Sequence, residues 1–206
     1  NISALRSYSI FDNHAVMITK EGQAFAIGSN ENGQIINTIS KEVHEREQLI
    51  EITDPQGNDC RFISAVCGHD YTLYLVTTDT TEINQLVYVY SNENNNHPLF
   101  LNINGRNPIS LYGGWRTSAA IDSEEGIYVI TKHVFSSPNH SIKRSFLPKG
   151  EKAISIACCN SFVIVATLSG RVFGSSLEDL ETGRLSRLVF DPVIELEGEE
   201  IVDVCG

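Results

Sequence analysis

Few residues of this 206-residue chain have the types and spacing that catalytic chemistry requires. His14 and the pair His69-Asp70 could act as general bases, but no nucleophile motif accompanies them. The chain has no Gly-x-Ser-x-Gly elbow and no glycine-rich loop followed by Lys-Ser or Lys-Thr. Both histidine positions fall at sharp corners, where exposed or structural histidines are expected. The sequence therefore predicts neither a catalytic residue nor a cofactor.

The five cysteines also lack the spacing of a metal site. No Cys-x-x-Cys pair occurs, and Cys158 and Cys159 are adjacent. Cys67, Cys158 and Cys205 occupy one position of a recurring apolar segment, so we expect small, buried strand residues there. We predict no metal site, and reduced thiols favour an intracellular protein, cytoplasmic or nuclear.

An internal repeat positions these residues. An apolar segment, a tight corner and a second apolar segment recur along the chain. The corners are Phe11, Gly68, Gly114, Cys159 and Gly206, separated by 57, 46, 45 and 47 residues. The second segments start at His14, Tyr71, Thr117 and Phe162. Short β-branched and aromatic runs bounded by Gly, Asn, Asp and Ser are typical of strands and turns.

This period predicts an all-β protein, a β-propeller built of repeats of about 45–57 residues. We expect one propeller segment over 1–206, with repeats at about 1–60, 61–106, 107–151 and 152–198, and the first strand of a fifth at 199–206. An ordinary β-sandwich is the alternative, but whole blocks recur in register, which favours the propeller. The best helix candidate, 39–52, is highly charged and is not favoured.

A second motif follows a strand in the first repeat. It reads Gly28-Ser29-Asn30-Glu31-Asn32-Gly33-Gln34, and residues 90–96 repeat it in degraded form. The motif lacks the lysine and the helix of a phosphate loop, so we predict a turn in which Gly33 adopts positive φ.

These blocks resemble the repeats of the regulator of chromosome condensation family (RCC1-type repeats). Gly28, Asn30, Gly33 and Gln34 match its Gly-x-Asn-x-x-Gly-Gln segment. Its Cys-Gly strand ends and corner glycine are matched by Cys67-Gly68, Gly114 and Cys205-Gly206. The family's corner histidine survives only as His14, and Ile35-Ile36 replace its Leu-Gly, so the chain resembles a divergent member.

The resemblance implies part of a ring. The family forms closed rings of about seven blades, roughly twice this chain. We therefore expect an incomplete ring, closed either by further blades of a longer protein or by a second copy.

The resemblance also implies two functions without a catalytic residue. Many members are protein-binding modules, and the founding member is a guanine nucleotide exchange factor for the small GTPase Ran. Exchange requires only differential affinity for two states of the GTPase. A non-catalytic protein-interaction propeller is the first hypothesis, and an exchange factor for a Ran-like small GTPase is the alternative. An unrelated role, such as inhibiting an extracellular enzyme, is disfavoured by the unpaired cysteines.

Charge and aromatic residues limit the kind of partner. A net charge of −11 argues against nucleic-acid binding, and no apolar run is long enough for a bilayer. Basic residues gather over 132–152 and acidic ones over 191–203, either as solvated loops or as a surface that steers a charged protein. Trp115-Arg116 follows a corner, and both types are enriched at binding hot spots. They form the candidate partner-binding pair, unless Trp115 instead packs between blades.

Overall fold

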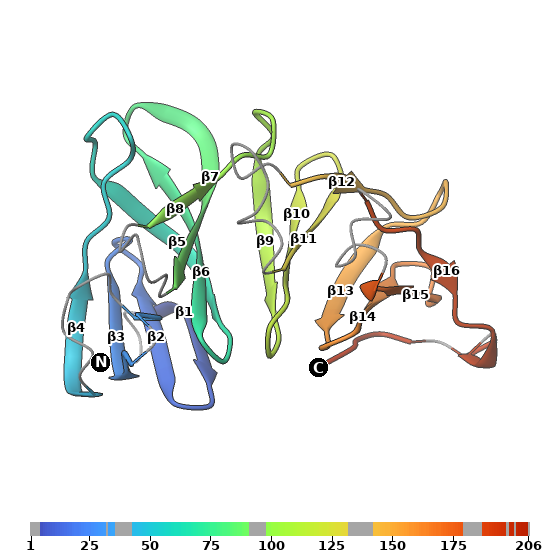
Figure 1. The fold of residues 1–206 in the computed structure, drawn as a ribbon. Helices are drawn as coiled ribbons and strands as arrows, with labels where there is room; N and C mark the ends of the chain where they lie inside the picture. Colours follow the sequence, from blue (N-terminus) through green and yellow to red (C-terminus); the bar gives the residue numbers. More distant parts are fainter. Residues whose placement is uncertain are drawn as a thin grey trace.

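Four antiparallel sheets of four strands each form the part of the chain that the structure describes (Figure 1). The structure is a computed structural model, and it describes residues 5–31, 33–35, 43–90, 98–131, 142–178, 187–196, 198–199 and 201–205. Each sheet pairs its strands in sequence order, as a propeller blade does. The predicted all-β propeller is therefore confirmed.

Each blade is built from one consecutive stretch of chain. Blade 1 contains β1 (Leu5–Phe11), β2 (His14–Thr19), β3 (Ala24–Ser29) and β4 (Val43–Ile50). Blade 2 contains β5 (Cys60–Cys67), β6 (Tyr71–Thr78), β7 (Thr81–Tyr90) and β8 (Leu99–Leu101). Blade 3 contains β9 (Pro108–Gly113), β10 (Ser118–Asp122), β11 (Ile127–Ile130) and β12 (Arg144–Ser145). Blade 4 contains β13 (Ala153–Cys158), β14 (Phe162–Thr167), β15 (Val172–Ser176) and β16 (Asp191–Pro192), followed by the short 3₁₀ helix η4 (Ile194–Leu196).

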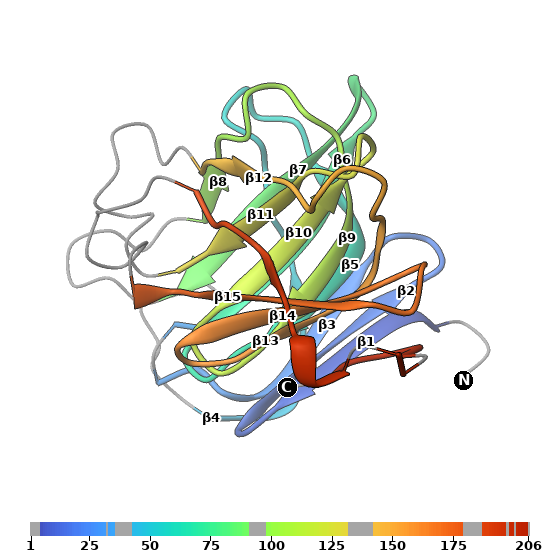
Figure 2. The same ribbon diagram turned by 90° about the vertical axis from the view of Figure 1, so that its right-hand side faces the viewer.

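The blades stand face to face in an open arc. Figure 1 shows them in chain order, and Figure 2 shows them stacked behind blade 4. The first strands of neighbouring blades contact each other, β1 with β5, β5 with β9 and β9 with β13. These first strands therefore lie where the blades converge, on the inner side of the arc. The ring is not closed.

Three apolar clusters fill the spaces between the blades. Side chains of successive strand residues point to opposite faces of a sheet, so each second strand serves two interfaces. In β2, Val16 and Ile18 face blade 2, and in β6 Leu73 and Leu75 face blade 3. The intervening residues Tyr74 and Val76 face back towards blade 1. This alternation explains why β6 is almost entirely buried.

The first and last blades each have one open face. Tyr8 and Ile10 of β1 are 71% and 70% exposed. One repeat later the same two positions are Ala65 and Cys67, which are buried against blade 1. The exposure of Tyr8 and Ile10 therefore reflects the absence of a preceding blade against this face.

Two sequence expectations are wrong in detail. Residues 201–205 do not form a strand, although Ile201 N donates to Gly170 O (3.1 Å) and Ser155 Oγ to Val204 O (3.1 Å). A strand requires a hydrogen-bonded neighbour, and no described strand pairs with this segment. The sequence also predicts that Cys205 is buried in a strand. It is exposed, whereas Cys67 and Cys158 are buried. Gly206 and the degraded motif over 91–96 lie outside the described residues.

Within the described residues, no helix is long and apolar enough to cross a membrane.

Candidate interaction site at the blade corners

The turns that join the first and second strands of blades 1, 2 and 3 meet on one side of the arc. His69 of the blade 2 corner donates its backbone N–H to Trp115 O of the blade 3 corner (2.9 Å). Its imidazole Nδ1 lies 2.9 Å from Asp12 Oδ2 of the blade 1 corner. Three blades thus contribute to one continuous surface near the inner end of the arc. We call Phe11, Asp12, His69, Trp115 and Arg116 the corner site.

Close packing of the blades brings the corners together. A Cβ on Gly114 would lie 1.8 Å from Cys158 O at the end of β13. A Cβ on Gly68 would lie 1.9 Å from the ring of Tyr71. Only glycine allows these approaches without a shift of backbone or ring. Gly114 therefore allows blades 3 and 4 to approach each other, and Gly68 leaves room for the Tyr71 ring within the corner of blade 2.

Trp115 is ordered by aromatic neighbours yet remains accessible. Its ring stacks on His69, with centroids 4.6 Å apart and planes at 16°. Phe11 meets it edge to face at 6.1 Å. The residue is nevertheless 45% exposed. Trp115 thus packs against two other corners and still presents its ring to solvent, and its role in partner binding stays a prediction.

Asp12 is hydrogen-bonded to the His69 ring that stacks on Trp115. It adopts φ 48°, an uncommon conformation for a residue other than glycine, which places its carboxylate beside His69. The sequence analysis missed Phe11 and Asp12 as members of the site. Their position at the corner of the repeat was the available signal, because residues in equivalent positions of successive blades become neighbours.

Arg116 completes the site with an unpaired charge. The residue is exposed, and among the described residues no hydrogen bond or ion pair to it is found. By contrast, Arg106 and Arg171, which also lie in turns between strands, pair with carboxylates. Arg116 is thus available to a partner without breaking an internal contact.

The Gly28-to-Gln34 loop closes the space between blades 1 and 2. Gly28 has φ +108°, and a Cβ there would lie 2.3 Å from Asn13 O. Gly33 has φ 61°, as a turn requires. The buried Asn30 side chain accepts from Ile35 N (3.0 Å), and Gln34 O accepts from the Thr72 hydroxyl of blade 2 (2.6 Å). The loop therefore fixes one blade to the next.

His14 is a structural part of the same contact. The single hydroxyl hydrogen of Thr72 is donated to Gln34 O, so the 3.0 Å contact between Thr72 Oγ1 and His14 Nε2 requires Nε2–H to donate. Burial lowers the pKa of His14 from 6.5 to about 4. The imidazole is therefore neutral at physiological pH, with a fixed tautomer. A general base would need a free acceptor facing a cleft, which this arrangement does not provide.

Tyr71 replaces His14 one repeat later and makes the equivalent inter-blade contact. Its hydroxyl lies 3.0 Å from both Gly114 O and Thr117 O of blade 3. Burial raises its pKa well above the usual value, so the hydroxyl stays protonated and donates. The departure from the family's histidine therefore preserves a hydrogen bond between blades.

The buried cysteines also join neighbouring blades. Cys67 Sγ lies 3.5 Å from Ser9 O, and Cys158 Sγ lies 3.9 Å from Tyr112 O. Burial raises the pKa of Cys67 to about 11, which leaves the thiol unreactive. Among the described residues, no group of His, Cys, Asp and Glu could hold a metal ion.

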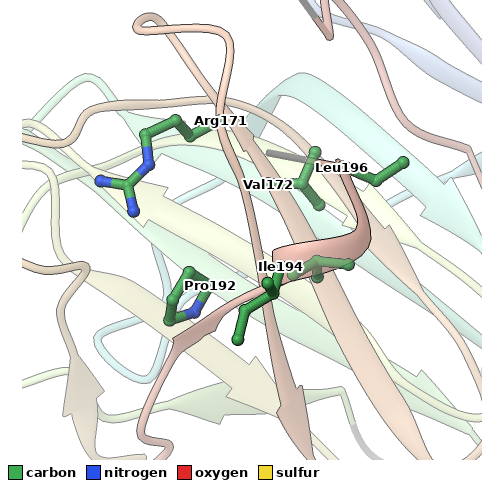
Figure 3. Close-up of a pocket in the computed structure, with 6 residues that line it drawn as sticks. Arg171, Val172, Pro192, Ile194 and Leu196 are labelled. Carbon is green, nitrogen blue, oxygen red and sulfur yellow. The ribbon is translucent and has the colours of Figure 1, made fainter. Parts of the chain in front are cut away.

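The described surface has several small hollows. Figure 3 shows one on the open face of blade 4, lined by Val172, Pro192, Ile194 and Leu196, with a cavity volume of about 50 Å³. The Arg171 side chain extends away from Ile194 and Leu196 in this view and pairs with Glu151 (3.0 Å). Ligand pockets are several times larger, so this hollow fits an apolar side chain at most.

Comparison with known proteins finds similarity to solved structures. A scan of protein-family models and a search of curated proteins gave no match. Among solved structures, human WBSCR16 is similar with a TM-score of 0.63 and 17% identity, over 84% of this chain and 47% of that one. Prp20p from Saccharomyces cerevisiae, which is yeast RCC1, is similar with a TM-score of 0.61 and 12% identity, over 92% and 50% of the two chains.

A third similar structure is also a propeller, with a lower TM-score and a lower identity. The β-propeller domain of Myceliophteria thermophila Cps50 (Swd1) is similar with a TM-score of 0.50 and 8% identity, over 91% of this chain and 57% of that one. The chain spans about half the length of the first two proteins. At these identities the likeness establishes the fold. It is the fold of RCC1-type propellers, in agreement with the repeat motifs.

Proposed function

We propose that this chain, which has the fold of RCC1-type propellers, is a non-catalytic protein-interaction module whose corner site binds a protein partner. The observation that carries the proposal is the state of Trp115, which is ordered by two aromatic neighbours and remains 45% exposed. A tryptophan that is already immobilised loses little entropy on binding.

The site has the composition of a protein-binding hot spot. Trp and Arg are the types most enriched at such positions, and an aromatic ring beside an unpaired guanidinium suits a partner that presents a carboxylate next to apolar surface. The site is formed by the turns between first and second strands, where Trp115 is 45% exposed. It therefore fits a protein surface better than a small molecule, which would require a concavity.

The proposal is tested by affinity capture from cell extract with a matched pair of variants. Trp115→Ala with Arg116→Ala should lose the captured partner by at least about tenfold, as expected when a hot spot is removed. The control is Arg6→Ala with Tyr8→Ala, which removes the same residue types from the open face of blade 1. Equal capture by the wild type and the Trp115/Arg116 variant, with both variants folded, would contradict the proposal. A collapse of thermal stability in that variant would assign Trp115 to packing alone.

Exchange activity on a small GTPase is the second candidate function. Its support is the similarity to Prp20p, whose structure was reported with its binding to Gsp1p and histones. Exchange requires no catalytic acid or base, since the activity rests on differential affinity. Release of a fluorescent guanine nucleotide from a panel of small GTPases, Ran included, tests this candidate. If the wild-type chain accelerates nucleotide release and the Trp115/Arg116 variant does not, the corner site is where the GTPase binds. If nucleotide release is not accelerated, only the binding-module proposal remains.

A further inference from the structure

A half-exposed apolar groove lies on the outer edge of the arc, away from the corner site. It runs between residues 146–148, which follow β12 of blade 3, and residues 187–190, which lead into β16 of blade 4. Its cavity volume is about 280 Å³. Phe146, Pro148, Arg187 and Val189 contribute to its walls. Phe146 and Val189 are 51% and 57% exposed. Two large apolar side chains thus face solvent across one groove.

The walls of the groove are anchored to the core. Leu188 N donates to Ser145 Oγ of β12 (2.9 Å), which ties the two walls together, and both ribbon views place them side by side (Figures 1 and 2). Leu188 and Phe190 are buried in the cluster between blades 3 and 4, so the alternate residues Arg187 and Val189 point outward. The groove is therefore a fixed feature of the fold.

Phe146 is held in place although it is exposed. The guanidinium of Arg144 lies 4.6 Å from the centre of its ring. Arg144 is in turn fixed by Asp122, with 2.8 Å between Nη2 and Oδ1. A cation over one ring face restricts the ring and leaves the rest of it available for contact.

The surroundings of the groove are basic in an acidic protein. Lys143, Lys149 and Arg187 are exposed, and no ion pair joins them to any described residue. Four carboxylates of this part of the chain are already engaged, Asp122 and Glu124 by Arg144, Glu125 by Lys152, and Glu151 by Arg171, whereas Asp191, next to Phe190, is exposed and has no ion pair with a described residue. Three exposed basic residues without a described ion pair thus lie on the segments that form this groove, in a chain whose net charge is −11. The basic stretch of the sequence, apart from Lys132, which lies outside the described residues, thus surrounds an apolar site.

We propose that this groove binds an extended segment of a partner protein in which apolar side chains alternate with carboxylates. The apolar residues would occupy the space between Phe146 and Val189, and the carboxylates would meet Lys149 and Arg187. An extended conformation fits because it presents alternate side chains in opposite directions, so apolar residues can enter the groove while the intervening carboxylates lie at its rim. This binding is independent of the corner site.

Selection from a random linear peptide library displayed on phage tests the proposal. The wild-type chain serves as target, with depletion on the Phe146→Ala, Val189→Ala variant. We expect enriched peptides in which Leu, Ile or Phe alternates with Asp or Glu. In a fluorescence-anisotropy assay the groove variant should weaken the enriched peptide by about tenfold or more, and Trp115→Ala should leave its affinity unchanged.

The charge component is tested separately. Arg187→Glu should weaken the peptide and reduce the salt dependence of its binding, because one of the attractive charges is reversed. All these positions are exposed, so circular dichroism and the thermal midpoint should match the wild type. No enrichment, enrichment of basic peptides, or peptides indifferent to Phe146 and Val189 would overturn the proposal. Concentration-dependent self-association that the groove variant abolishes would assign the groove to a second copy of the chain and would also overturn it.

Discussion

At the scale of single residues, the hydrogen-bonding role of each polar group decides whether it can do chemistry. His14 has the right residue type for a general base, but its Nε2–H is committed to Thr72, and the ring is buried. Arg116 has no described partner and is therefore free to bind. The polar groups between the blades thus serve stability, and those at the corners remain for recognition.

The buried His14 predicts a pH dependence of stability. Its pKa is about 4 in the folded chain and 6.5 when unperturbed. The unfolded state therefore binds the proton first, so stability is complete above pH 6.5, falls as the pH drops towards 4, and changes no further below that through this group. The largest effect is roughly 3 kcal/mol.

Urea unfolding between pH 7 and 4.5 measures this contribution. The His14→Gln variant keeps a donor without the titration, so its stability should vary less with pH over this range. Parallel profiles for the variant and the wild type would show that His14 is not the group responsible.

A methyl group added at Gly114 should strongly lower the free energy of unfolding. A Cβ at Gly114 would lie 1.8 Å from Cys158 O, so Gly114→Ala must push blades 3 and 4 apart at the inner strands. We expect a loss of about 2–4 kcal/mol in the free energy of unfolding. Gly174→Ala is the matched control, since its nearest contact would be 3.7 Å from Val193 Cγ2, an ordinary distance. Chemical denaturation of both variants would contradict the account if they were equally stable.

At the scale of elements, short-range patterns in the sequence predicted the blades well. The positions of β1, β2, β5, β6, β9, β10, β13 and β14 follow from apolar runs that end at repeated corners. The second strands β6 and β10 of the inner blades are the clearest, because they are buried on both faces. The short outer strands β12 and β16 carry little pattern, since each has only two residues.

Contacts between elements were less accessible from the sequence. The stack of His69 on Trp115 joins residues of different blades, and nothing local in the sequence specifies it. The turn over Glu124-Glu125-Gly126 shows a similar limit. Glu125, and not Gly126, adopts the positive φ of 67°, whereas a Cβ on Gly126 would collide with Arg144 at 1.9 Å. That glycine is explained by packing against β12, which the turn pattern alone does not reveal.

At the scale of the whole molecule, the open faces of blades 1 and 4 are where the arc would meet further blades. Residues in equivalent positions have opposite environments there. Ile10 is 70% exposed, whereas Cys67 is buried. The same position therefore contributes to stability only where a neighbouring blade covers it.

This contrast predicts different effects of the same kind of substitution. Ile10→Thr should change the free energy of unfolding of this chain by no more than about 0.5 kcal/mol and should reduce its self-association. Cys67→Thr should destabilise the chain by about 1–3 kcal/mol, because it places extra volume and a hydroxyl in the cluster between blades 1 and 2. Equal losses, measured by urea unfolding and light scattering, would show that the face of blade 1 is covered.

The central claim is that the blade corners, rather than a pocket or an open blade face, bind the partner. Hydrogen–deuterium exchange of the chain with and without its captured partner tests this claim most directly. We predict that binding protects the amides around residues 11–13, 68–70 and 114–116, with little change at β12 and over 187–190. Protection confined to β1 and β2, to blade 4 or to the outer edge, with the three corners unchanged, would contradict it.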